Sequence, residues 1–292
     1  MVTVSVPGKV ILMGDHAIVH GKPGLIAAIN KRLSVSVNRG LAKNDEYIDH
    51  IKGIVEKHFG LKEIPNLQVS IVSEIPSGYH LGSSAAVAVG TIGAIMYFLK
   101  KIWNPSLINQ LAYDADKFVH KTPSGADNTA ITFGGFLWYR KELEFLRSFW
   151  QLPMKIPKNF NHFFLIDTGK PLENTGEMVA FVRKQKNLPA FLSENEIQTK
   201  RMATAIKESD ERSFIDAMRK GERTLEAIGV VSKKVIPVIR SIEKFGGAVK
   251  ILGGGGRRSG VGYLLCYTKN PLRGAIPIEL GEEGIRLEKK HN

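Results

Sequence analysis

The sequence predicts a mixed protein of strands and helices in two parts, and three observations indicate this fold class. Near the start of the chain, runs of alternating apolar and polar residues are separated by Gly and Pro, as is typical of strands. An Ala-rich stretch that is apolar on nearly all sides then indicates a buried helix. After a proline-broken stretch, amphipathic helical patterns precede two strands that flank a glycine cluster.

The first part is expected to contain strands on both sides of two helices. The strands are predicted at residues 3–6, 10–12, 33–37, 67–72, 130–133 and 136–139, and the helices at 83–99 and 106–119. The pattern breaks between Pro153 and Asn161, so we expect a boundary there between a domain of residues 1–157 and a domain of residues 158–292. The second domain is predicted to contain strands at 162–166, 248–252 and 262–267 and helices at 174–186, 194–207, 211–228 and 233–245.

Charge limits the class of function. Lysine and arginine number 41 against 28 acidic residues, a surplus of +13 that suits nucleic acid, an anionic surface or anionic small substrates. A basic solvated surface without a specific partner explains the same surplus. Because the basic residues are spread along the chain rather than gathered in blocks with aromatics, the pattern disfavours nucleic-acid binding.

The sequence favours a cytoplasmic protein. No apolar run is expected to approach the roughly 18–20 residues that a membrane span needs, and the first residues indicate a strand rather than a secretory signal. The single cysteine, Cys266, excludes an internal disulfide and a zinc site built from cysteines. It lies in an apolar strand and is expected to be a core residue.

Three glycine-rich segments carry residues suited to chemistry, and the middle one runs from Pro76 to Ala86. Its glycines let the backbone approach an anion, and the first amides of the following helix point outward at the positive end of the helix dipole. This arrangement favours phosphate binding, with the hydroxyls of Ser83 and Ser84 placed to cap the helix or to bind magnesium. A plain capped helix explains the same residues, and the segment is neither a Walker A sequence nor a Rossmann fingerprint.

The second segment, from Lys121 to Asn128, contains a Pro-Ser-Gly turn that presents Asp127. Asp and Asn favour such turns for local reasons, but a carboxylate held on a stiff turn is also suited to accept a proton from a hydroxyl. Just upstream, Asp116 and His120 lie one helical turn apart and therefore share a face of their helix.

The third segment contains Pro7-Gly8-Lys9 and, shortly after it, Gly14-Asp15-His16. A lysine that follows a glycine near a strand is often only solvated. Beside an acid and a histidine, Lys9 becomes a candidate for anion binding.

Together these segments resemble the GHMP kinases, and the third is similar to the opening of the mevalonate kinases. Residues 7–23 read PGKVILMGDHAIVHGKP and differ from that pattern by Asp15 in place of the usual Glu and by one conservative Ile. The middle segment matches the superfamily's phosphate loop except at His80, where the loop normally has Gly. The turn before Asp127 also matches, and Asp116 stands where the family has a magnesium-binding Glu.

The end of the chain resembles the family as well. Residues 166–179 are similar to the segment that ends in a substrate-side Thr or Ser. The last glycine loop, residues 250–260, departs from the usual Gly-Ala-Gly-Gly-Gly-Gly-Cys by its extra length and by Arg257 and Arg258. Four motifs therefore appear in the expected order over nearly the whole chain.

The resemblance implies an α+β GHMP kinase fold with the active site in the cleft between two domains. Residues 1–157 would form the ATP-binding domain, like ribosomal protein S5 domain 2, and residues 158–292 a ferredoxin-like domain. The implied reaction is transfer of the γ-phosphoryl group of ATP to the C5 hydroxyl of mevalonate, with Mg²⁺ as the metal. No nucleic acid or membrane partner is expected, and a homodimer is left open.

The resemblance also implies the role of each site residue. Asp127 would accept the hydroxyl proton, and Lys9 would stabilise both the ionised Asp127 and the charge that develops on the phosphate. His20 and His162 are expected to be structural. The other implied residues are Pro76, Gly78, Leu81, Gly82, Ser83, Ser84 and Ala85 for ATP, Ser84 and Asp116 for magnesium, and Asp15, His16, Thr175 and Gly254 for mevalonate.

Two other functions stay open at this point. One is a different GHMP kinase that acts on phosphomevalonate or a sugar, although the Gly-Asp-His-Ala run favours mevalonate. The other is a non-catalytic, nucleic-acid-binding descendant, which we would expect to have lost Lys9 or Asp127, and both are present.

Overall fold

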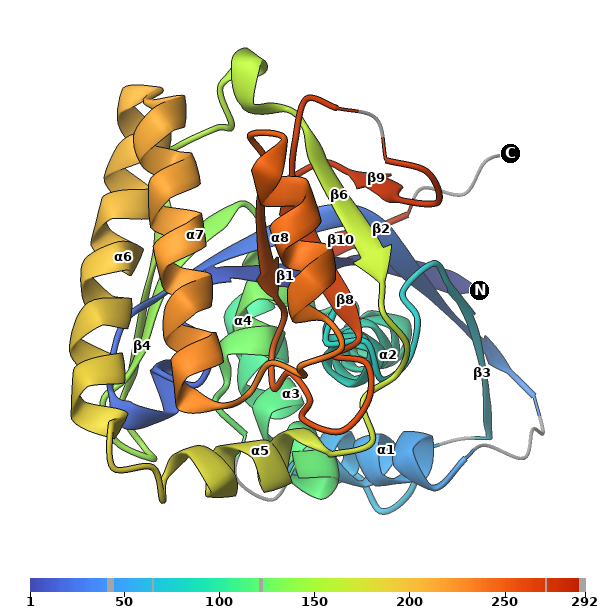
Figure 1. Cartoon of the computed structure of the whole chain (residues 1–292). Helices are drawn as coiled ribbons and strands as arrows, with labels where there is room; N and C mark the ends of the chain where they lie inside the picture. The colour runs from blue at the N-terminus through green and yellow to red at the C-terminus, as the bar shows by residue number, and fades with distance from the viewer. Residues whose placement is uncertain (41–44, 65, 121–122, 271, 289–292) are drawn as a thin grey trace.

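The computed structural model describes residues 1–40, 45–64, 66–120, 123–270 and 272–288. It contains two sheets with antiparallel strand pairing and helices packed around them (Figure 1). The first sheet has the order β10-β1-β2-β4-β5, with β3 also paired to β2, and the second has the order β7-β8-β6-β9. The first sheet comprises β1 (Val2–Met13), β2 (Gly24–Arg39), β3 (Leu67–Ser73), β4 (Phe136–Lys141), β5 (Arg147–Leu152) and β10 (Arg286–Leu287).

The second sheet and the helices complete the element list. The strands are β6 (Phe163–Asp167), β7 (Ala248–Ile251), β8 (Tyr263–Tyr267) and β9 (Ile276–Ile278). The helices are α1 (Glu46–Phe59), α2 (Ser83–Lys100), α3 (Pro105–His120), α4 (Ala126–Phe133), α5 (Thr175–Val182), α6 (Leu188–Glu208), α7 (Glu211–Ile228) and α8 (Ile236–Lys244), with short 3₁₀ turns η1 (Ile18–His20) and η2 (Lys158–Phe160). Most predicted elements are confirmed, whereas α1, β5, β9 and β10 had no counterpart in the prediction.

The first strand differs from the prediction because it is continuous. Two strands broken by a turn at Pro7 and Gly8 were expected, but β1 runs through both residues and keeps its pairing with β2. The register shifts between Pro7 and Gly8, which marks a bulge. A bulge accommodates proline because the residue there need not donate a ladder hydrogen bond.

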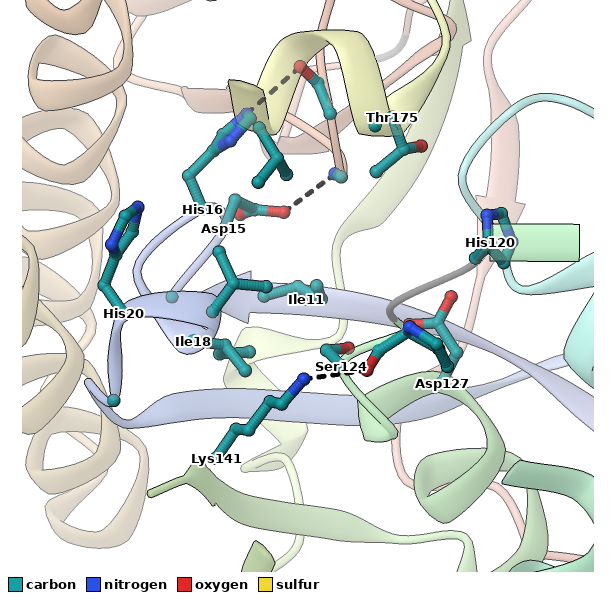
Figure 2. A pocket seen from close by; sticks show the side chains of 18 of the residues that line it. Ile11, Asp15, His16, Ile18, His20, His120, Ser124, Asp127, Lys141 and Thr175 are labelled. Atoms are coloured by element: carbon teal, nitrogen blue, oxygen red, sulfur yellow. Dashed lines mark hydrogen bonds between the residues drawn. The ribbon is translucent and has the colours of Figure 1, made fainter. Parts of the chain in front are cut away.

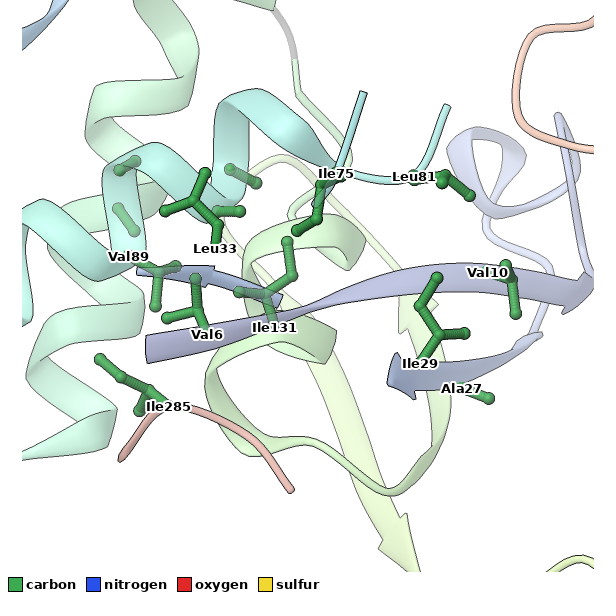
Figure 3. Packing of buried hydrophobic residues seen from close by; sticks show 14 of the residues in the cluster. Val6, Val10, Ala27, Ile29, Leu33, Ile75, Leu81, Val89, Ile131 and Ile285 are labelled. Carbon is green, nitrogen blue, oxygen red and sulfur yellow. The ribbon is translucent and has the colours of Figure 1, made fainter. Parts of the chain in front are cut away.

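The strand predicted at residues 130–133 is wrong, because these residues form the end of α4. The apolar run with β-branched Ile131 and Thr132 looks like a strand in isolation. Gly125, with a left-handed φ of 80°, starts the helix, and Asp127 lies in its first turn. Figure 3 shows Ile131 pointing into the cluster of apolar side chains over the sheet, so tertiary packing decides the conformation.

Helix α2 is the central helix of the larger core. Its residues from Ala85 to Met96 are almost all buried, and Val89 belongs to the same apolar cluster as Leu33 and Val6 (Figure 3). By length and composition, α2 is apolar enough to cross a membrane, which corrects the expectation that no run approaches that length, but 61% of it is buried inside the protein. Helix α2 is therefore a core helix of the folded protein.

The largest apolar cluster contains residues from both halves of the chain. Val6 and Phe214, from the first and second halves, belong to the same apolar cluster. The chain also returns to its start, because Leu287 in β10 pairs with Val4 in β1. Such packing holds the ends of β1 and β7 close together at the pocket described next.

Candidate functional site

A pocket of about 480 Å³ lies where the two halves of the chain meet (Figure 2). Its walls come from the end of β1, η1, the C-terminal end of α3, the start of α4, the β4–β5 turn, α5 and the loop after β7. Seven of the residues expected at the site line this pocket: Lys9, Asp15, His16, Asp116, Asp127, Thr175 and Gly254. They come from four separate parts of the sequence, which supports the grouping made from motifs.

The glycine loop before α2 lies beside the pocket rather than in its wall. Only His80 of this loop lines the pocket, whereas the residues expected to bind ATP do not: Pro76, Gly78, Leu81, Gly82, Ser83, Ser84 and Ala85. Lys9 joins the two features, because its amide donates to the carbonyl oxygen of Leu81 and its Nζ to that of His80, both at 3.0 Å. Gly82 begins α2 in a left-handed conformation without a side-chain cap, so the first amides of the helix are available to an anion.

Lys9 and Asp127 form an ion pair at the edge of this loop. The Nζ–Oδ1 distance is 3.0 Å, with the lysine side chain 3% exposed and the aspartate 35% exposed. The bulge in β1 precedes Lys9, and the left-handed Gly125 places Asp127 in the first turn of α4. Figure 2 shows Asp127 and Lys141 on one side of the pocket and His16, Asp15 and Thr175 on the other.

His80 takes the conformation that glycine would take. Its φ is +63°, in the left-handed region that costs an ordinary residue about 1 kcal/mol. Burial and the nearby charge of Lys9 lower the pKa of its imidazole to about 4, so the ring is neutral at pH 7. The ring lies against the last glycine loop, because a Cβ on Gly253 would meet His80 at 2.8 Å. His80 therefore occupies a backbone conformation that glycine adopts without strain.

Replacing His80 by Gly should give a more stable protein than replacing it by Ala. Both variants lose the ring, but only glycine adopts a positive φ without strain, which is worth about 1 kcal/mol. Urea unfolding of the two variants measures the difference directly. Equal stabilities would mean that the loop relaxes to a negative φ at this position.

Asp116, His120 and Ser84 form a polar cluster beside the pocket. His120 Nε2 lies 3.8 Å from Asp116 Oδ1 and 3.4 Å from Ser84 Oγ, which confirms that Asp116 and His120 share a face of α3. Burial raises the pKa of Asp116 to about 6, and its Oδ1 accepts no hydrogen bond from the part of the chain that the structure describes. An unsatisfied carboxylate oxygen beside a serine hydroxyl suits a hard cation such as Mg²⁺.

Two protein ligands are fewer than a complete metal site. Among the described residues, no group of three or more His, Cys, Asp and Glu side chains could hold a metal ion. Magnesium usually keeps several waters and takes its remaining ligands from substrate phosphates, so Ser84 and Asp116 fit a nucleotide-bound ion.

Asp15 is buried beneath the pocket, and both of its carboxylate oxygens have partners. Oδ2 lies 2.6 Å from Nζ of Lys250 on β7, and Oδ1 accepts the amide of Gly253 at 2.7 Å. The next residue, His16, has a left-handed φ of 60° and places Nε2 3.1 Å from the carbonyl oxygen of Gly254. Burial lowers the pKa of His16, so its ring is neutral at pH 7 and donates this hydrogen bond from Nε2.

Glu222 on α7 is a buried carboxyl group that the sequence did not single out. Its Oε2 accepts the amide of Ile251 at 2.9 Å, next to Lys250, while Oε1 has no partner in the described structure. Burial raises its pKa to about 8, so the group is protonated at neutral pH. The burial of an acid on an amphipathic helix depends on what packs against it, and the sequence carries no signal for that.

Glu222→Gln should stabilise the protein more at pH 8 than at pH 5. Because the folded pKa lies above the unfolded value of 4.5, the contribution of Glu222 to stability is full below about pH 4.5 and is lost as the pH rises towards about 8. Glutamine does not titrate, so its advantage over wild type should grow by about 1.4 kcal/mol per pH unit in this window. Urea unfolding at both pH values measures the difference in stability between Glu222→Gln and wild type. The control is Glu208→Gln, at the exposed end of α6. An advantage that does not change with pH would contradict the protonated state.

The acceptor side of the pocket is framed by α5 and the last glycine loop. Thr175 is the first residue of α5, which Asn174 caps, and a Cβ on Gly254 would lie 3.3 Å from its Cα. The two arginines of the loop do not line the pocket. Arg258 pairs with Glu173 at 2.9 Å, and Arg257 lies over the ring of Phe181.

Two cations in the pocket wall were missed from the sequence, Lys141 and Arg183. Lys141 donates to the carbonyl oxygen of Pro123 at 3.1 Å and pairs with Glu144. The guanidinium of Arg183 has no acidic partner among the described residues. His20, expected to be structural, also lines the pocket, and burial together with the charge of Arg183 lowers its pKa. Neither Lys141 nor Arg183 lies in a glycine motif, so nothing in the local sequence marked them as residues of the pocket.

Two other expectations can be compared with the structure. His162 lies near the ring of Tyr267, outside the pocket wall. Cys266 is a core residue, as predicted, and its burial raises the pKa of the thiol to about 12.

Comparison with known proteins identifies the family of the whole chain. The profile of the GHMP kinases N terminal domain matches residues 46–135. The mevalonate kinase of Archaeoglobus fulgidus is 32% identical over 98% of this chain and 99% of its own length, and that of Thermococcus onnurineus is 30% identical over 99% and 98%. A crystal structure of a mevalonate kinase superposes with a TM-score of 0.80 at 20% identity, over 96% of this chain and 99% of that one, which confirms the α+β fold. By its full-length similarity to these proteins, the chain belongs to the GHMP kinase family.

Proposed function

We propose that this chain transfers the γ-phosphoryl group of ATP to the C5 hydroxyl of mevalonate. The observation that supports the chemistry is the ion pair between Lys9 and Asp127, 3.0 Å apart, in a pocket beside a glycine loop and a helix N-terminus. The choice of acceptor is supported by the full-length relatives, which are named mevalonate kinases.

Phosphoryl transfer needs positioning and charge stabilisation more than covalent chemistry. The C5 hydroxyl oxygen attacks the γ-phosphorus, its proton passes to the carboxylate of Asp127, and the bond between phosphorus and the β–γ bridging oxygen breaks to release ADP. Lys9 holds the carboxylate of Asp127 in place, 3.0 Å from its Nζ, and stabilises the negative charge on the transferred group. Because the lysine is almost fully buried, its charge acts with little screening by water.

The nucleotide is assigned to the loop before α2. The first amides of α2 and the left-handed backbone at Gly78 and Gly82 hold the phosphates, as helix N-termini do for anions. Ser84 and Asp116 hold Mg²⁺, which when bound neutralises phosphate charge. The division into an ATP-binding domain of residues 1–157 and a second domain of residues 158–292 is part of this proposal, with β10 returning to the first sheet.

The acceptor is assigned to the other side of the pocket. Mevalonate carries a carboxylate, and Arg183, without an acidic partner among the described residues, is a cation in the pocket wall suited to it. His16 and Thr175 line the same side, and the apolar Ile11 and Ile18 lie between the two sides in Figure 2. A cytoplasmic enzyme is consistent with the burial of α2 and of the single thiol.

An ADP-release assay with ATP, Mg²⁺ and a panel of acceptors tests the proposal. The panel contains mevalonate, 5-phosphomevalonate, homoserine and galactose, and we expect turnover on mevalonate alone. Turnover on another acceptor would retain the kinase chemistry and refute the assignment of mevalonate. No ADP release with any of the four acceptors, together with salt-sensitive binding of RNA or DNA, would instead support the nucleic-acid-binding alternative.

A further inference from the structure

Lys250 is a buried cation that the proposed chemistry does not use. It lies on β7, and neither its side chain nor that of Asp15, 2.6 Å away, has any exposed surface. The ammonium also donates to the main-chain oxygens of Ile11, at 3.0 Å, and Ile251. A lysine ammonium has three donors, and these three acceptors use all of them. Lys250 is therefore unable to contact a substrate directly.

Asp15 connects this ammonium to the glycine loop after β7. One carboxylate oxygen faces Lys250 and the other accepts the amide of Gly253 at 2.7 Å. His16 reaches the same loop at the carbonyl oxygen of Gly254, 3.1 Å from its Nε2. Figure 2 shows both dashed contacts on the side of the pocket that carries Thr175. The ends of β1 and β7 are thus tied together at the wall of the pocket.

One residue at this junction has a strained backbone. His16 has a left-handed φ of 60°, whereas Gly253 and Gly255 adopt φ values of 58° and 66° that glycine takes without strain. A left-handed conformation at a residue such as His16 persists where the surrounding contacts hold it. Because Gly254 packs closely on Thr175, a displacement of the loop would change the space between His16 and Thr175.

We infer that Lys250 is a positioning residue for the acceptor side of the pocket: through Asp15 it holds His16 and the glycine loop at the spacing the acceptor requires. The inference rests on the proposed function, which assigns the acceptor to this side. Asp15 acts through the loop in the same way, because both of its carboxylate oxygens already have partners. A purely structural ion pair would stabilise the fold without favouring one substrate over the other.

The test uses two variants and a matched control. Asp15→Asn keeps an acceptor for the amide of Gly253 and removes only the charge. The double variant Lys250→Met with Asp15→Asn removes both charges, so neither is left buried alone. The control is Lys22→Met, because the ion pair of Lys22 with Glu196, at 2.8 Å, also joins the two halves of the chain, and neither residue lines the pocket.

Two measurements are made on each full-length protein. Initial-rate kinetics should show the KM for mevalonate rising by about tenfold or more in both variants, while the KM for ATP stays within about threefold of wild type. Amide hydrogen exchange should become faster in residues 251–256 of the same variants. The Lys22→Met control should match wild type in both measurements.

Equal rises in both KM values would overturn the inference. So would a lower unfolding temperature with unchanged kinetics and exchange, because Lys250 would then be only a structural ion pair. If the double variant does not fold, the KM values and the amide exchange of Asp15→Asn alone test the inference. A wild-type protein that does not phosphorylate mevalonate refutes the proposed function instead, and the exchange of residues 251–256 still shows whether Lys250 and Asp15 hold the loop.

Discussion

Asp127→Asn is expected to lower kcat by about 10²–10⁴-fold, the contribution typical of a positioned general base. Asparagine has nearly the same shape, so Asp127 can be replaced without disturbing the first turn of α4. It cannot accept the hydroxyl proton, and the ammonium of Lys9 loses the carboxylate that lies 3.0 Å away. A coupled assay of ADP release under saturating ATP and mevalonate measures the loss.

The matched control for this variant is Asp114→Asn on α3. Asp114 also pairs with a lysine, Lys117, at 2.7 Å, but both side chains are about half exposed and neither lines the pocket. We expect its kcat to be unchanged and its stability to fall by less than about 1 kcal/mol, as for surface ion pairs. If Asp127→Asn kept near-full turnover, Asp127 would not be the base.

Local chemistry explains which parts of the site could be predicted. Gly82 and Gly125 both precede helices and both adopt positive φ values, and such turns leave a readable signature of glycines and small polar residues. The same signature placed Lys9 and Asp127 in one pocket because the motifs resemble a known family. His80, at a position where the family's loop has Gly, adopts a left-handed φ of 63°.

Long-range packing explains what could not be predicted. Asp15 and Lys250 are separated by 235 positions, and nothing local to either residue shows that they meet in a buried ion pair. Residues 130–133 have the composition of a strand, yet packing over the sheet and the start at Gly125 make them helical. Arg183, which directly follows α5, lines the pocket only because α5 packs beside the pocket. In each case the outcome depends on residues far away in the sequence.

Lys9→Met is expected to lower kcat by about 10²–10³-fold, the cost of removing one preorganised group that stabilises transition-state charge. Methionine replaces most of the lysine stem, so the buried volume beside Gly82 stays filled. What is lost is the ammonium between Asp127 and the carbonyl oxygen of His80. Rates measured with saturating substrates separate this loss from weaker binding, and Lys117→Met on the surface of α3 serves as control.

The combination of Lys9→Met with Asp127→Asn tests whether the two side chains act as one unit. If the lysine works partly by holding the carboxylate of Asp127 in place, removing both side chains should cost little more than the more severe single change, because the effects of residues in direct contact are not additive. The surface pair Asp114 and Lys117 provides a parallel set of variants in which no loss is expected. Losses that multiply in the double variant would mean that Lys9 acts on the phosphate alone. The ion pair at 3.0 Å predicts the first result, since neither group can be removed without changing the electrostatic surroundings of the other.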